Sequence, residues 1–136
     1  MHPILRNILA AAAGILAGMA LNEGIIISSA YLVPPPEGAD MMTPEGIEAA
    51  MPLLQPKHFL MPFLAHALGT FAGAYLSSLL SANNKMRIAL SIGGIFLSGG
   101  LMAAYMIPAP IWFVAADLML AYLPMAYLAG RIAFKE

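Results

Sequence analysis

The chain has 136 residues, of which 61% are hydrophobic and 10% charged, and it has no cysteine. A water-soluble domain carries about 25% charged residues, and a small fold cannot bury so large an apolar fraction. The composition therefore excludes a water-soluble globular protein and makes the lipid bilayer its solvent. The net charge of −1 argues against a nucleic-acid partner. The lack of cysteine excludes disulfides and thiolate metal sites.

Four segments are long and apolar enough to cross a bilayer core of about 30 Å, which takes about 20 helical residues. They cover approximately residues 8–33, 59–82, 88–107 and 111–133. Backbone groups in lipid must be hydrogen-bonded within their own segment, so each segment is predicted to be a helix. We therefore predict an all-α integral membrane four-helix bundle, a single transmembrane domain over residues 1–136.

The connection over residues 34–58 is the one long loop between these segments. It is predicted to hold a short helix over about residues 44–54, because Thr43 can cap it and Pro44 suits its first position. The apolar face of this helix would consist of Ile47, Met51 and Leu54. Such a face is typical of a helix that lies on a membrane surface, where it could cover a site below. A solvated loop with one helical turn is the alternative.

Positive side chains that flank short loops indicate the orientation of the bundle. Five of them fall at one end of the predicted helices: Arg6, Lys85, Arg87, Arg131 and Lys135. Lys57 falls at the other end, beside the acidic residues of the long loop. We therefore predict a multi-pass protein with both termini in the cytoplasm and the long loop outside.

Small residues recur at helical spacing within the segments, which in lipid lets helix backbones approach closely. The glycines predicted to pack helices are Gly14, Gly18, Gly69, Gly73, Gly93 and Gly100. The third segment has small residues on more than one face, so a second copy of the chain or a partner in a membrane complex could pack there. In the fourth segment, Pro124 is predicted to kink the helix and free the carbonyl of Leu120.

Three ionisable residues lie within the apolar segments: Glu23, His66 and Asp117. Counting 1.5 Å per residue places Glu23 roughly 22 Å from the inner end of its helix. His66 and Asp117 lie roughly 10 Å and 9 Å from the outer ends of theirs, at the same level. A charged group in a transmembrane helix costs at least ~2.5–3.5 kcal/mol, so we expect the three to converge inside the bundle. Asn22 adds an amide beside Glu23.

Several interpretations of this cluster are open. It could be a hydrogen-bonded polar core that fixes helix register. It could instead bind a proton, a cation or a small polar ligand from outside. The signal for a metal ion held by Glu23, His66 and Asp117 is weak, because their spacing runs across helices. An enzymatic site is less favoured, since no nucleophile–base motif is visible, and no cofactor is indicated. Transport across the whole bilayer is disfavoured, because the cytoplasmic half has no matching polar residues.

Three stretches are distinctive: PPPEG at 34–38, PKHFLMPFLAHALGTFAGA at 56–74 and PAPIWFVAADL at 108–118. Together they resemble a group of small four-helix membrane proteins of bacteria, over most of the chain. The resemblance implies a four-helix fold in the bacterial inner membrane and implies nothing about chemistry. The preferred hypothesis is a small polytopic protein whose outward-facing polar cluster binds a proton, cation or small polar ligand. The alternative is a structural or accessory subunit of a larger membrane complex.

Overall fold

Helices form nearly all of the regular structure in the computed structural model, which describes residues 1–135. In chain order they are α1 (Pro3–Leu32), α2 (Pro44–Ala50), the 3₁₀ turn η1 (Met51–Leu53), α3 (Lys57–Leu80), α4 (Lys85–Met106), α5 (Ile111–Leu120) and α6 (Leu123–Lys135). Within residues 1–135, four segments are long and apolar enough to cross a membrane: α1, α3, α4 and the consecutive pair α5–α6. The predicted all-α architecture with a short additional helix is confirmed.

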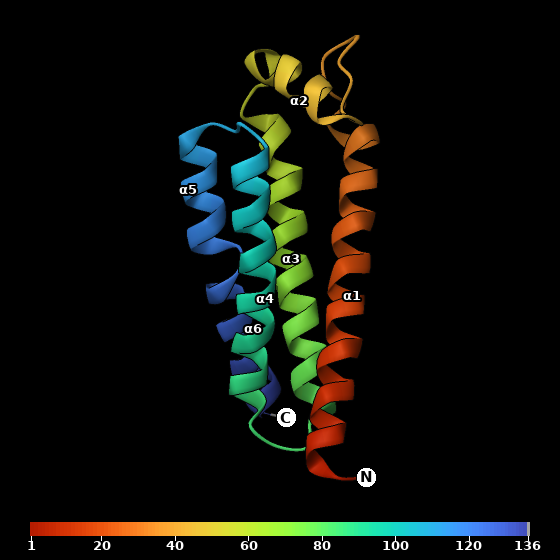
Figure 1. The fold of residues 1–136 in the computed structure, drawn as a ribbon, viewed down its shortest axis with the longest axis vertical. Helices are drawn as coiled ribbons and strands as arrows, with labels where there is room; N and C mark the ends of the chain where they lie inside the picture. The colour runs from red at the N-terminus through yellow and green to blue at the C-terminus, as the bar shows by residue number, and fades with distance from the viewer. Residues whose placement is uncertain (136) are drawn as a thin grey trace.

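The four segments stand side by side, with both termini at one end and α2 at the other (Figure 1). The first helix begins at Pro3, earlier than the apolar run near residue 8 suggested. The reason is local, because proline suits the first helical position and His2 Nδ1 accepts a hydrogen bond from the Ile4 N–H at 3.3 Å. The last segment is broken between Leu120 and Leu123, where Pro124 was predicted to kink it.

Small side chains fill the interior, and large apolar side chains point outward. The buried apolar residues are mostly alanines, namely Ala10, Ala50, Ala65, Ala67, Ala74, Ala89, Ala121, Ala126, Ala129 and Ala133. By contrast, Leu16 is 68% exposed, Met102 66% and Ile111 87%. In water this arrangement would be unfavourable, but in lipid the large side chains are solvated and the small ones let helices pack closely. The distribution therefore agrees with a protein that contacts the lipid bilayer.

Helices α1 and α3 form the most extensive contact of the bundle. A Cβ atom added at Gly18 would lie 2.6 Å from the Gly69 carbonyl oxygen, and one at Gly73 would lie 2.8 Å from the Gly14 carbonyl oxygen. No side chain fits at such a separation, so the two backbones touch directly. A similar contact joins α4 to α6, where a Cβ at Gly93 would lie 2.5 Å from the Cβ of Ala126.

At the end that holds the termini, side chains of α1 bind the turn between α3 and α4. The Arg6 Nε donates to the Leu80 carbonyl oxygen at 2.8 Å, next to the negative end of the α3 dipole. Asn7 uses both ends of its amide: Nδ2 donates to Asn83 Oδ1 and Oδ1 accepts from the Ala82 N–H, each at 2.8 Å. These bonds fix α1 against the α3–α4 turn.

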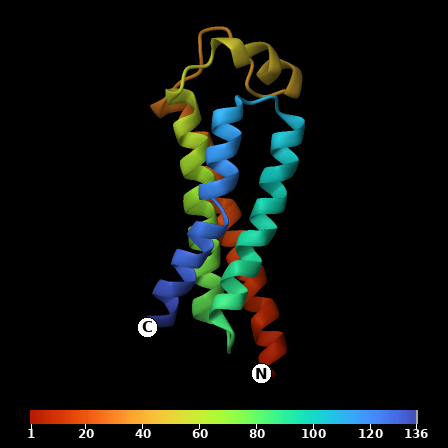
Figure 2. The ribbon, with the colours of Figure 1, turned by 90° about the vertical axis from the view of Figure 1, so that its left-hand side faces the viewer.

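At the opposite end, the loop with α2 lies across the bundle (Figure 2). Thr43 caps α2 by accepting from the Gly46 N–H at 3.1 Å, and its hydroxyl donates to Asp40 at 2.7 Å. The Met42 N–H and the Thr43 hydroxyl both donate to the Asp40 carboxylate, which holds its pKa below the ordinary value. The loop therefore has a defined start for its short helix.

A single histidine joins the two ends of this loop. The Gln55 N–H donates to His58 Nδ1 at 2.8 Å, so the ring proton of a neutral His58 sits on Nε2. His58 Nε2 in turn lies 3.2 Å from the Pro34 carbonyl oxygen and donates to it. Pro34 is where the chain leaves α1, and Gln55 precedes α3, so His58 closes the base of the loop.

The contact between α1 and α3 predicts a difference between two glycines of α1. Gly14→Ala should lower the free energy of unfolding by about 1–3 kcal/mol, because the new methyl group meets the Gly73 backbone and Ser77. Gly24→Ala is the matched control, since nothing lies within 4 Å of a Cβ there. Unfolding in mixed detergent micelles, followed by circular dichroism, measures both. Equal losses for the two variants would contradict the packing described.

Candidate functional site

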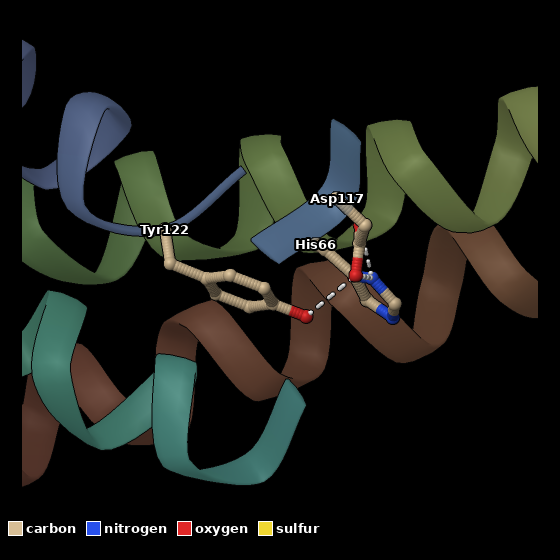
Figure 3. A network of polar contacts seen from close by, with 3 residues as sticks. All are labelled: His66, Asp117 and Tyr122. Carbon is tan, nitrogen blue, oxygen red and sulfur yellow. Dashed lines mark hydrogen bonds and ion pairs between the residues drawn. The ribbon is translucent and has the colours of Figure 1, made fainter. Parts of the chain in front are cut away.

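Three polar side chains meet within the bundle: His66, Asp117 and Tyr122 (Figure 3). His66 Nδ1 lies 2.8 Å from Asp117 Oδ1 and 2.9 Å from Asp117 Oδ2. The Tyr122 hydroxyl donates to Asp117 Oδ2 at 3.1 Å. Asp117 is buried, with 6% of its side chain exposed, whereas 25% of the His66 side chain is exposed. The buried carboxylate therefore accepts two hydrogen bonds and leaves the histidine at the edge of the network.

The break between α5 and α6 brings Tyr122 to Asp117. Proline has no N–H and clashes with the carbonyl four residues earlier, so Pro124 prevents the helix from running through Leu120. Residues five apart in a continuous α-helix point roughly 140° away from each other. Asp117 and Tyr122 could not meet in such a helix, but the chain turns at Ala121 and directs the phenol back toward the carboxylate. Pro124 predicts the kink from the sequence, whereas the return of the Tyr122 phenol to Asp117 has no counterpart in the sequence pattern.

Neighbouring helices hold Tyr122 in this position. A Cβ added at Gly100 of α4 would lie 2.5 Å from the Tyr122 hydroxyl oxygen, so the phenol fits only because position 100 carries no side chain. On the other side, the rings of His66 and Tyr122 stack with centroids 5.7 Å apart and an interplanar angle of 26°. Tyr122 itself is 2% exposed and packs with Ala67 and Ala121. The tyrosine is thus confined between α3 and α4.

The hydrogen bonds define what the network can do chemically. An ionised Asp117 only accepts, so the neutral His66 must carry its proton on Nδ1 and present a lone pair on Nε2. Among residues 1–135, no hydrogen-bond partner faces Nε2. A carboxylate that fixes a histidine tautomer also stabilises the imidazolium when Nε2 takes up a proton. In this arrangement Nε2 is the ring nitrogen of a neutral His66 at which a further proton can add.

The expected convergence of three ionisable side chains is corrected to two. Glu23 is exposed on α1 and has no hydrogen bond or ion pair within residues 1–135. The reason is helical geometry. Asn22 packs against α3, because a Cβ added at Gly69 would lie 3.0 Å from the Asn22 Cβ. The next residue, Glu23, points about 100° away from this contact. Asn22 makes no hydrogen bond to His66 or Asp117.

Metal binding receives no support from this geometry. Residues 1–135 contain no group of three His, Cys, Asp or Glu side chains that could hold a metal ion. Asp117 is bonded to Nδ1 of His66, so a cation at the open Nε2 would lie across the imidazole ring from the carboxylate. A single open histidine nitrogen remains, which is too few ligands for a stable site.

Buried hydroxyl groups extend along α3 beyond His66. Thr70 and Ser77 are fully buried and their hydroxyl oxygens have no partner within the described chain. Ser78 donates to the Lys85 carbonyl oxygen at 3.0 Å. The expectation that the half of the bundle nearer the termini has no matching polar residues was therefore wrong. A few serine and threonine residues change the mean hydropathy of an apolar segment very little, so hydropathy does not reveal them.

Comparison with known proteins adds no family to this description: no protein-family model, curated protein or solved structure matches the chain. What the chain itself shows is a four-helix protein with membrane-length apolar helices and a polar network between α3, α5 and the α5–α6 break.

The fit of Tyr122 against α4 predicts a coupled effect of two substitutions. Tyr122→Phe should cost about 1.5–3 kcal/mol of unfolding free energy, as expected for a hydrogen bond to a charged group. Gly100→Ala should displace the phenol, so that Tyr122→Phe costs nothing further in that background. Gly99→Ala is the control, because nothing lies within 4 Å of a Cβ at that position. The double-mutant cycle is measured by unfolding in detergent. Additive costs in the Gly100→Ala background would show that the two residues are independent.

Proposed function

We propose that this protein is a small polytopic protein of the bacterial inner membrane that binds and releases a proton at His66. The observation that carries the proposal is the asymmetry of the histidine ring: Nδ1 is held by the buried Asp117 at 2.8 Å, and Nε2 has no partner among the described residues. A purely structural histidine in a membrane would be expected to use both nitrogens, because an unpaired polar atom in hydrocarbon is costly.

The charge of the network supports a proton over other cations. With neutral His66 and ionised Asp117 the pair carries one negative charge in a medium of low dielectric constant. A proton added to Nε2 leaves the Nδ1–H on Asp117 and makes the pair neutral, without moving any other group. A metal cation at Nε2 would lie across the imidazole ring from the Asp117 carboxylate, which is bonded to Nδ1, and would have a single protein ligand. Tyr122 remains the hydroxyl donor to Asp117 in both states.

The proposed orientation, with both termini and the α3–α4 turn in the cytoplasm, is supported by the excess of positive side chains at that end. His66 then lies about 14 Å from the outer end of α3, counting nine residues from Lys57 at the helical rise. The loop with α2 lies over this end of the bundle (Figure 2). Protons would therefore exchange with the outside, and the partnerless hydroxyls of Thr70 and Ser77 lie in the direction of the cytoplasm.

Proton uptake can be measured directly in vesicles that contain the purified protein. After an external pH jump, an impermeant pH dye outside the vesicles should report protons bound by wild type and by His58→Gln, the control histidine. His66→Gln should reduce the number of protons bound by about one per chain, because it removes the accepting nitrogen. Asp117→Asn should weaken proton binding, because an amide carries no negative charge to stabilise the protonated ring. An undiminished signal in His66→Gln vesicles would refute the proposal.

The alternative, an accessory subunit of a membrane complex, has its own supporting observation. Glu23 is exposed on α1 at about the level of His66 and has no partner within residues 1–135. An ionisable group that faces lipid costs at least ~2.5–3.5 kcal/mol, which a second protein could offset by covering it. If so, Glu23→Leu should change the size of the particle extracted from native membranes in mild detergent. A monomer-sized particle for both wild type and variant would exclude this role.

A further inference from the structure

Four positive side chains gather at the end of the bundle that holds the termini. Lys85 and Arg87 belong to the first turn of α4, and Arg131 and Lys135 belong to the last turns of α6. Within residues 1–135 none of the four has an ion-pair partner. The fifth positive side chain of this end, Arg6, already binds the Leu80 carbonyl oxygen. These four charges therefore have no anionic partner among residues 1–135.

Two open hollows lie between these side chains. One has a volume of about 490 Å³ and is lined by Asn83, Asn84, Lys85, Met86, Arg87 and Phe134. The other has a volume of about 350 Å³ and is lined by Met86, Arg131, Phe134 and Lys135. Because both are lined by Met86 and Phe134, they adjoin across an apolar strip that separates the two pairs of cations. A ligand that spans them would need a negative part and an apolar part.

The start of α4 contributes to the negative part. Asn84 precedes the helix in a left-handed conformation with φ of 53°, and no side chain caps the helix. The first N–H groups of α4 therefore lack a side-chain acceptor beside Lys85 and Arg87, where an anionic oxygen can accept from them. A helix end alone would not make a site, but here it lies in a hollow lined by two cations.

Arg131 is held in place on the other side of the apolar strip. Its Nη1 donates to the Tyr127 hydroxyl at 3.2 Å, and its guanidinium lies 5.9 Å from the centre of the Tyr127 ring. Guanidinium groups have five N–H donors, so the remaining ones stay available for a phosphate oxygen. Phe134, which lines both hollows, is 74% exposed and presents its ring to the surroundings of the bundle.

From this combination we infer that the four cations bind the phosphate of an anionic phospholipid headgroup, with Met86 and Phe134 against its glycerol and the start of its acyl chains. A lipid fits better than free phosphate because the apolar strip lies within the site and because Phe134 is exposed at the end of a membrane-length segment. The site lies at the far end of the bundle from the loop with α2 (Figure 1). It does not depend on the proposed proton function.

The test uses the full chain in a nonionic detergent, with native mass spectrometry as the readout. Short-chain phosphatidylglycerol, the matching phosphatidylcholine and inorganic phosphate are titrated separately. Phosphatidylglycerol should bind more tightly than phosphatidylcholine, and Lys85→Gln, Arg87→Gln or Arg131→Gln should each weaken it about fivefold. Lys57→Gln, which removes a cation at the opposite end, should leave the affinity unchanged.

Three results would overturn the inference. If phosphatidylglycerol and phosphatidylcholine bind equally, or if Lys57→Gln weakens binding as much as the other variants, the four cations do not form a headgroup site. If inorganic phosphate binds as tightly as phosphatidylglycerol, and Phe134→Ser changes neither affinity, then the ligand is free phosphate and the lipid assignment is wrong. Phe134→Ser should weaken lipid binding and leave phosphate binding as it is. Circular dichroism checks that each variant remains helical.

Discussion

A helix that crosses a membrane has no water to bind its polar groups, and the rest of this structure depends on that constraint. Backbone groups are paired within the helices, so the fold consists of helices. Large side chains are solvated by lipid, so the interior can be built from alanine, glycine and small hydroxyl residues. The direct backbone contact of α1 with α3, at Gly14, Gly18, Gly69 and Gly73, follows from this choice. The other two segments pack chiefly on α3 of this pair, and α1 makes a small contact with α4.

Burying polar groups in such an interior is energetically unfavourable, and three parts of the chain together form the polar network. The Pro124 break turns Tyr122 toward Asp117, Gly100 makes room for its phenol, and α3 supplies His66. Each polar atom of the network is paired except His66 Nε2, for which no partner lies within residues 1–135. That exception is what separates a proton-binding interpretation from a polar core whose only role is to fix helix register.

The membrane-length helices could be predicted from the sequence, and so could the meeting of two of the three ionisable residues within them. Counting along the segments placed His66 and Asp117 at one level, and they meet. The outward position of Glu23 could also have been predicted. Gly14, Gly18 and Asn22 lie on one stripe of α1, and the residue after Asn22 must point away from that stripe. Tyr122 was not predictable in the same way. Its position depends on the angle at which α6 leaves the break and on the space beside Gly100, which no spacing rule specifies.

The central claim is that Asp117 fixes the His66 tautomer and leaves Nε2 open. Nitrogen-15 NMR of histidine-labelled protein in lipid bilayers, with His2 and His58 assigned by substitution, reports which ring nitrogen carries the proton. We predict that neutral His66 is protonated at Nδ1, with a hydrogen-bonded signal, and unprotonated at Nε2. A neutral His66 that carries its proton on Nε2, or a signal that Asp117→Leu leaves unchanged, would contradict it.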